Sequence, residues 1–368
     1  MSAPARSNRA AGAEMAPATA ALHRAMSYAR LTDGGMNPAD ARILLAETAA
    51  GDDWTQTASS LSDRRADAAA LALVRGQHRT AELMQRWAVG AALFAQMAEN
   101  TDTDLKRSLY GRYVDQTRQL AALPTPVLER IETPYRTGRL TGWLRLPRSG
   151  CAEATVIMWG GLTGWGAAYL RSADALAERG VACLLAEGPG QGEPRLRDGL
   201  HVDTDTVAGF ARFVDVVAAD PRMGDAIGVQ GNSSGGLFAA HLAAIDDRIR
   251  ACVVNGAPAA PTLPRFRSAR EQLAAEVGTS DDDEINYILA GLRFDPHSHP
   301  IRCPVLVLHG GSDPLVASPD LQQPFVDAAG DRGELRIWSD GDHALHNHAE
   351  ERDAFTADWF AGHLMASP

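Results

Sequence analysis

The sequence predicts an α/β protein, in which a mostly parallel, doubly wound sheet of eight strands follows an all-helical region. Two observations lead to this prediction. Residues 16–123 are nearly free of strand signals and carry apolar residues at helical spacing. From residue 127 on, short apolar runs alternate with helix-like segments, as in proteins whose parallel strands are joined by helical crossovers.

The N-terminal third of the chain divides into a short tail and a helical domain. Residues 1–15 are expected to be disordered, because they are rich in Ala, Ser and Arg and hold no long apolar run. Residues 16–125 are expected to form a helical cap domain. Asn37-Pro38 marks a helix start and Leu123-Pro124-Thr125-Pro126 a stop and linker. Residues 126–368 would then form the second domain.

Eight strands are expected in that second domain. Apolar runs with strand character lie at residues 127–134, 140–146, 154–159, 181–186, 226–230, 249–254, 304–308 and 334–338. Between the sixth and seventh strands, residues 258–299 are expected to form a small helical insertion with an acidic helix start at Asp281. This insertion and the N-terminal helices would together cover the strand ends as a lid.

Bulk composition narrows the class of partner. In 368 residues, 45% are hydrophobic and 22% charged, which is ordinary for a globular protein with a sizeable core. The net charge of −11 disfavours nucleic acid and anionic membranes as partners. The four cysteines are scattered without metal-ligand spacing, and no run of 18 apolar residues occurs. We therefore expect a cytoplasmic protein that acts on a small molecule.

The most informative motif is Gly231-Asn232-Ser233-Ser234-Gly235, between an apolar strand and a helix-like segment. In a nucleophile elbow the serine occupies a cramped turn, so glycines are needed two residues before and two after it. Ser233 would then stand at the carboxyl end of the sheet. The competing interpretation is a simple glycine-rich turn.

An acid and a histidine follow, each after its own strand. Asp313 lies just past the seventh strand and His343 just past the eighth. The chain order Ser, Asp, His is that of the α/β-hydrolase fold, and it differs from the orders of chymotrypsin-like and subtilisin-like enzymes. His343 would take the proton of Ser233, and Asp313 would orient and stabilise the imidazolium. Asp340 and Asp342 are nearer to His343 in sequence and are weaker rivals to Asp313.

A metal site is the alternative for the histidine-rich stretch. His343, His346 and His348 with Asp342 include suitable zinc ligands, but the chain lacks an HExxH helix and a cysteine partner there. We therefore predict neither a metal nor another cofactor.

The loop after the third strand, residues 159–164, is expected to supply part of an oxyanion hole. In this fold one amide comes from that loop and the other from the residue after the nucleophile. Leu162 and Ser234 are the candidate N–H donors, with Gly161 beside them. A phosphate-binding loop is excluded, because no Gly-Lys-Ser/Thr ending and no complete GxGxxG are present.

Several segments resemble a known family. The stretches at 187–193, 231–236, 301–306 and 341–343, with helices before them, are similar to the α/β-hydrolase family of 2,6-dihydroxypseudooxynicotine hydrolase. Fungal polyketide-shortening hydrolases of the yellowish-green pigment type are also similar. The resemblance implies metal-free hydrolysis of a C–C bond beside a ketone by Ser233, Asp313 and His343 under a helical cap, often in a homodimer.

Two departures from the family pattern keep other activities open. Residues 256–268 hold no carboxylate that could assist as an extra acid, and Glu187 stands where such enzymes more often have Asp. Hydrolysis of a small ester or thioester therefore remains an alternative, and an inert binding protein of the same fold is a second. An enclosed, mainly apolar substrate cavity is expected, with Trp87, Phe94, Trp165 and Phe266 as candidate lining aromatics.

Overall fold

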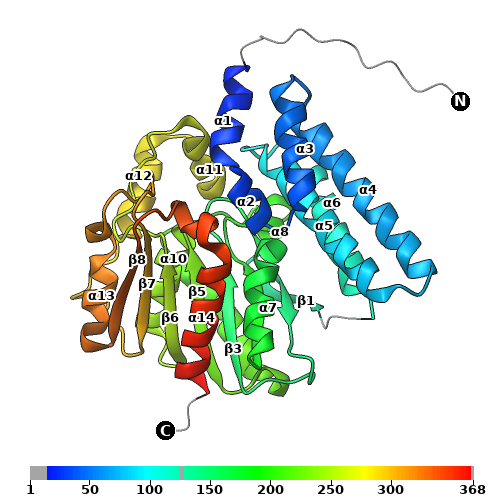
Figure 1. Ribbon diagram of the computed structural model, residues 1–368. Helices are drawn as coiled ribbons and strands as arrows, with labels where there is room; N and C mark the ends of the chain where they lie inside the picture. Colours follow the sequence, from blue (N-terminus) through cyan, green and yellow to red (C-terminus); the bar gives the residue numbers. More distant parts are fainter. Residues whose placement is uncertain (1–14, 125–127, 366–368) are drawn as a thin grey trace, which may run out of the picture.

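The computed structural model describes residues 15–124 and 128–365. Figure 1 shows a sheet with helices on both faces and a group of N-terminal helices over one end of the strands. The disorder expected for residues 1–15 concerns residues that, apart from Met15, lie outside the described part. Thr125, Pro126 and Val127, at the expected linker and strand start, also lie outside it.

Within residues 15–124, the N-terminal region consists of six helices. They are α1 (Pro17–Ala25), α2 (Tyr28–Asp33), α3 (Pro38–Ala49), α4 (Trp54–Val74), α5 (His78–Met97) and α6 (Asp104–Ala121). The expected start at Pro38 is present, since the Asn37 side chain accepts a hydrogen bond from the amide of Ala39 at 2.8 Å. Helices α4 and α5 form an antiparallel pair, in which Trp54 donates to the carbonyl of Phe94 at 3.0 Å.

Among the described residues, the sheet has eight strands in the order β1-β2-β4-β3-β5-β6-β7-β8. Strands β1 and β2 run antiparallel to their neighbours, and the other pairings are parallel. The eight-stranded, mostly parallel sheet predicted from the sequence is thus confirmed. The strands are β1 (Leu128–Tyr135), β2 (Gly138–Arg145), β3 (Ala154–Trp159), β4 (Val181–Glu187), β5 (Ala226–Asn232), β6 (Ile249–Asn255), β7 (Val305–Gly310) and β8 (Gly333–Trp338).

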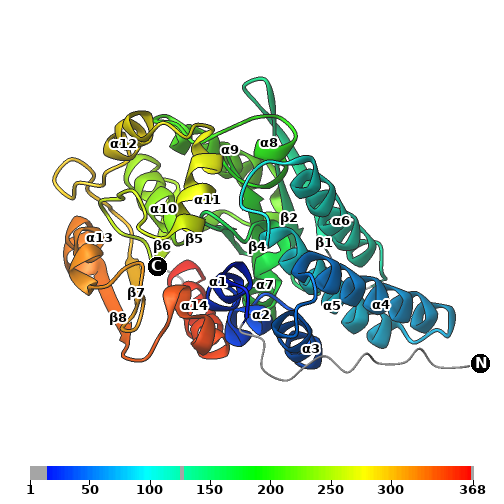
Figure 2. The ribbon, with the colours of Figure 1, turned by 90° about the horizontal axis from the view of Figure 1, so that it is seen from above.

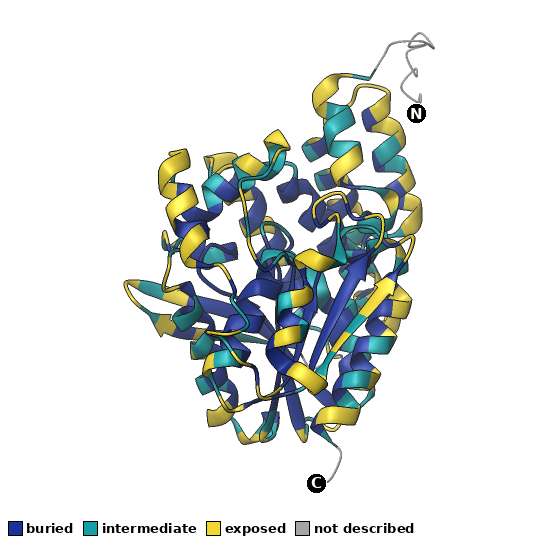
Figure 3. Cartoon of the chain, turned by 90° about the vertical axis from the view of Figure 1, so that its left-hand side faces the viewer, coloured by how far each residue is buried: buried dark blue, intermediate teal, exposed yellow. Residues whose placement is uncertain are grey.

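Side chains of the central strands alternate between two core layers. In β3, Val156 and Met158 face one layer and Ile157 and Trp159 the other. Both faces are covered, which explains why these strands are continuously apolar (Figure 3). The first layer is continuous with the N-terminal helices, so the helical region and the sheet share one hydrophobic core.

Helices cover the two faces unequally. The face that shares its core with the N-terminal region carries α7 (Leu170–Glu178) and α14 (Ala349–Leu364). The opposite face carries α9 (Thr206–Ala219), α10 (Ser234–Ile245) and α13 (Gln323–Ala329), and the short α8 (Gly192–Leu196) follows β4. Among the described helices, none is both long and apolar enough to cross a membrane.

The segment between β6 and β7 forms two helices, α11 (Arg267–Val277) and α12 (Asp282–Gly291). The Asp281 side chain caps α12 by accepting from the amides of Asp283 and Glu284, at the expected acidic helix start. Seen from above, α11 and the N-terminal helices lie on different sides of the strand ends (Figure 2). They meet where Asn100 donates to Glu271 at 2.9 Å.

The burial of α11 can be tested through Glu276, a buried carboxyl on this helix. Its carboxyl is buried, Oε1 has no hydrogen-bond partner among the described residues, and burial raises its pKa from 4.5 to about 8. The folded state therefore prefers the neutral form. The contribution of this group to stability is complete below about pH 4.5 and is lost as the pH rises towards 8.

We expect Glu276→Gln to raise the free energy of unfolding by about 4 kcal/mol at pH 7.5, because that pH lies about three units above the unfolded pKa and the amide never carries a charge. At pH 5 the difference from the wild-type chain should nearly vanish. Urea unfolding at both pH values measures it, and a gain of equal size at pH 5 would contradict the assignment.

Candidate active site

Ser233 occupies a sharp turn between β5 and α10. Its backbone has φ 55° and ψ −133°, an unfavourable conformation for a residue with a side chain. The turn requires glycine two residues before and two after Ser233, since a Cβ on Gly231 would lie 1.9 Å from the carbonyl oxygen of Gly235. This is the strand, turn and helix expected of a nucleophile elbow.

The structure brings Ser233, His343 and Asp313 together. His343 Nε2 lies 3.0 Å from Ser233 Oγ, and His343 Nδ1 lies 2.8 Å from Asp313 Oδ2. An ionised Asp313 accepts from Nδ1–H, which leaves Nε2 to accept the serine proton. Three residues from three separate loops at the carboxyl ends of strands thus form one hydrogen-bonded chain.

Asp313 is held in its charged form. Burial raises the pKa of this carboxyl, but hydrogen bonds from His343 and from the amides of Val316 and Leu315 outweigh that effect and leave the pKa below its usual value. The rival acids lie elsewhere, since Asp340 binds His348 and Asp342 accepts from the amide of Asn347.

The loop that carries His343 is fixed by contacts that sequence reasoning missed. Ala344 and Leu345 both have positive φ, 59° and 61°. The carbonyl of Ala344 accepts from Asn255 Nδ2 at 3.0 Å and from Arg352 at 3.0 Å. Asn255 also donates to the side chain of Asn232, beside Ser233, at 2.7 Å. One amide therefore links the histidine loop to the serine turn.

A carboxylate of the helical region completes this network. Asp33, at the end of α2, binds the guanidinium of Arg352 at 2.9 and 3.0 Å and His346 Nδ1 at 2.6 Å. Burial alone would raise the pKa of Asp33, but Arg352 and His346 hold it well below its usual range. Arg352 also binds Asp353 at 2.8 Å. The helical region is thus joined by a buried ion pair to the helix that follows His343.

The structure does not gather the three histidines considered as metal ligands. His343, His346 and His348 each contact a different carboxylate, namely Asp313, Asp33 and Asp340. Within residues 15–124 and 128–365, no group of three or more His, Cys, Asp and Glu residues could hold a metal ion.

The loop after β3 lies against the serine turn. A Cβ on Gly161 would be 2.8 Å from Ser233 Cβ, so only glycine permits this approach. The loop is held from behind, as Gln191 donates to the carbonyl of Gly160 at 2.6 Å and Trp165 to that of Gly161 at 2.8 Å. Leu162 lines the same cavity as Ser233, and Ser234 begins α10. The roles of Gly161, Leu162 and Ser234 in an oxyanion hole stay predictions.

The cavity beside Ser233 and His343 has a volume of about 110 Å³. Its walls come from both parts of the chain: α2 supplies Arg30, α5 supplies Leu93, Phe94 and Met97, and α11 supplies Gln272. The site therefore lies beneath the N-terminal helices and the insertion.

The aromatic residues expected around this cavity behave differently from one another. Phe94 lines it as predicted. Trp165 is buried behind the loop after β3, where its ring NH is used for the carbonyl of Gly161. Phe266 is 53% exposed and does not line the cavity, because it precedes α11 on the outer side of the insertion. The prediction for these last two residues was wrong.

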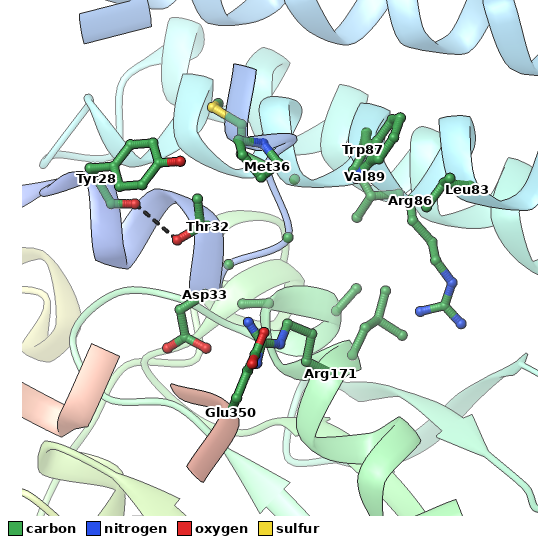
Figure 4. Close-up of a pocket in the computed structure, with 17 residues that line it drawn as sticks. Tyr28, Thr32, Asp33, Met36, Leu83, Arg86, Trp87, Val89, Arg171 and Glu350 are labelled. Atoms are coloured by element: carbon green, nitrogen blue, oxygen red, sulfur yellow. Dashed lines mark hydrogen bonds between the residues drawn. The ribbon is translucent and has the colours of Figure 1, made fainter. Parts of the chain in front are cut away.

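Trp87 lines a neighbouring, larger cavity of about 430 Å³. Figure 4 shows this cavity between α2, α5 and α7, with Tyr28, Arg86 and Arg171 among the residues that line it. Asp33, Gly34 and Ala168 line both cavities, so the two adjoin at the turn after α2.

Glu187, the residue that departs from the family pattern, is buried and hydrogen-bonded between the helical region and the sheet. Its buried carboxyl accepts a short hydrogen bond from Tyr110 of α6 and one of 2.8 Å from Thr141 of β2. Burial raises the pKa of Glu187. This side chain joins the helical region to the sheet and does not line the cavity beside Ser233.

Comparison with known proteins places the chain among hydrolases. No protein-family model matches it. 2,6-Dihydropseudooxynicotine hydrolase of Paenarthrobacter nicotinovorans is 27% identical over 293 residues, 76% of either chain. Hydrolase acrC of Aspergillus aculeatus is 37% identical over 151 residues, which are 36% of this chain and 35% of its own.

Solved structures agree on the fold. The crystal structure of 2,6-dihydroxy-pseudo-oxynicotine hydrolase superposes with a TM-score of 0.81 at 23% identity, covering 92% of this chain and 96% of the other. AbyA5 superposes with a TM-score of 0.68 at 19% identity, covering 93% and 98%. The predicted α/β-hydrolase fold is confirmed, and with it the expected resemblance and the assignment as an enzyme.

The ion pair between Asp33 and Arg352 yields a stability prediction. Asp33→Ala should lower the free energy of unfolding by about 3 kcal/mol, because it leaves a buried guanidinium short of one partner while Asp353 remains. The matched control is Asp247→Ala, which breaks an exposed pair with Arg302 and should cost at most about 0.5 kcal/mol. Urea unfolding compares them, and equal small losses would contradict a supporting role for Asp33.

Proposed function

We propose that this α/β-hydrolase is a serine hydrolase that breaks a C–C bond next to a ketone, in a β-diketone or an aryl ketone of aromatic or polyketide origin. The proposal rests chiefly on the hydrogen-bonded chain Ser233, His343 and Asp313 beside a covered cavity. Ser233 is the nucleophile, His343 the general base and acid, and Asp313 the residue that orients the imidazole.

The reaction has two halves. Ser233 Oγ bonds to the ketone carbon as His343 takes its proton, and the resulting oxyanion is held by the amides of Leu162 and Ser234. When the C–C bond breaks, its electron pair stays with the leaving carbon, which receives the proton from His343. Water, activated by His343, then cleaves the acyl-enzyme to a carboxylic acid and restores Ser233.

The lining of the cavity supports His343 as the proton carrier. Among the described residues that line it, the one carboxylate is Asp33, which is already bound to Arg352 and His346. No free carboxylic acid on these lining residues is therefore available to protonate the leaving carbon. The substrate must therefore stabilise the negative charge of the leaving carbon itself, as a fragment that departs as an enol or an electron-rich ring does.

Cleavage of an ester or thioester is the second candidate, since the same three side chains serve it without a carbanion. The preference for a C–C bond derives from the resemblance to 2,6-dihydropseudooxynicotine hydrolase. We also propose a homodimer, because of that resemblance. A cytoplasmic location is proposed from the composition of the chain.

The nucleophile is tested by Ser233→Ala. Turnover should fall by about 10⁴ to 10⁶ in kcat, because the change removes the attacking hydroxyl, while the thermal unfolding midpoint changes little. Ser60→Ala, which alters an exposed serine of α4, is the control and should leave both quantities unchanged. Fluorophosphonate labelling of wild type but not of Ser233→Ala would agree, whereas an unlabelled wild type would favour an inert binding protein.

The reaction type is tested by a mass-spectrometric screen of β-diketones, acyl-phenols and aryl esters with a chelator present. We expect turnover of at least one ketone class, unchanged by the chelator, because backbone amides stabilise the oxyanion without a Lewis acid. Turnover of esters with none of any ketone would replace the C–C assignment by ester hydrolysis. Activity lost on chelation would point to a metal site instead.

A further inference from the structure

Arg30 is a charged side chain in the wall of the cavity that holds Ser233 and His343. It comes from α2 and is half-buried. One guanidinium nitrogen donates to the carbonyl of Ala25 at 2.7 Å and the other terminal nitrogen to Thr163 Oγ1 at 2.7 Å. Thr163 follows Leu162 in the loop after β3, so the guanidinium bridges the helical region and the loop beside the nucleophile.

Both partners of Arg30 are neutral. Of the five N–H groups of an arginine, these bonds use two, which leaves three without a bond to another described residue. Among the described carboxylates, none lies within 4.0 Å of this guanidinium. Burial lowers the pKa of Arg30, although Tyr169, Asp342 and Asp33 act at longer range in the opposite direction. An arginine nevertheless keeps its charge at neutral pH.

The other charges of the cavity wall are already paired. Arg352 is bound to Asp33 and Asp353, and Asp33 also binds His346. Burial lowers the pKa of His346, which favours the neutral imidazole. Arg30 is therefore the cation of the described cavity wall whose charge no contacting carboxylate balances. A desolvated cation in that condition attracts an anion strongly.

We propose that Arg30 forms an anion subsite, and that the substrate carries an oxyanion (a carboxylate, or an ionised enol or phenol) that binds this guanidinium while its carbonyl faces Ser233. This inference deepens the proposed function and rests on it. The guanidinium is held in place before binding, so little ordering cost is added when the anion arrives. Arg30 would be a specificity-determining residue of the helical region.

The subsite is tested by binding, without turnover. In Ser233→Ala, isothermal titration compares 4-oxo-4-phenylbutanoate with 4-methyl-1-phenylpentan-1-one, in which an isopropyl group replaces the carboxylate. The two probes match in shape and differ in charge. We expect the carboxylate to bind about tenfold to a hundredfold more tightly, the usual range for a hydrogen bond to a charged group.

Adding Arg30→Met should remove that preference while leaving the affinity for the neutral ketone within about twofold. Arg30→Lys should retain part of it, because the charge stays but the paired geometry is lost. Arg212→Met, which removes an exposed arginine of α9, controls for net charge and should preserve the full preference. Thermal unfolding of each variant verifies the fold.

An unchanged preference in Arg30→Met, or equal or absent binding of both probes by Ser233→Ala, would overturn the subsite. Failure of the proposed function is seen separately, as full turnover or labelling in Ser233→Ala with Arg30 intact. The two inferences therefore fail in different experiments.

Discussion

The backbone turn at Ser233 is the constraint on which the site depends. A residue with a side chain adopts φ 55° there, and the conformation is held because β5 and α10 continue rigidly on either side. The fit extends beyond the turn, since a Cβ on Gly235 would come within 2.2 Å of the carbonyl oxygen of Gly160. The serine turn and the loop after β3 are therefore packed backbone to backbone, and their spacing follows from the absence of side chains.

The helical region is part of the site as well as its cover. Asp33 compensates the charge of Arg352, and Arg352 in turn fixes the carbonyl beside His343. The region also shares a core layer with one face of the sheet and holds Glu187 through Tyr110. Through these contacts the region forms part of the wall of the site.

Much of this arrangement could be predicted from the sequence, because it depends on local patterns. The strands are apolar runs of the right length, and Ser233, Asp313 and His343 each follow a strand, so their meeting at one sheet edge follows from parallel topology. Asn255 and Arg352 could not be found in this way. Their hydrogen-bond partners lie far away in the sequence. The positive φ of Ala344 could not be predicted either, because the residue at that position is not a glycine. The outward position of Phe266 likewise depends on how α11 is oriented.

The ion pair between Asp33 and Arg352 joins residues 319 positions apart, which affects how the chain matures. Synthesis proceeds from the N-terminus, so α2 leaves the ribosome long before the helix that carries Arg352. Until then Asp33 lacks the cation that makes its burial favourable, and water remains its better environment. Helix α2 can therefore form early on the ribosome, but Asp33 finds its cation only after the last helix has emerged.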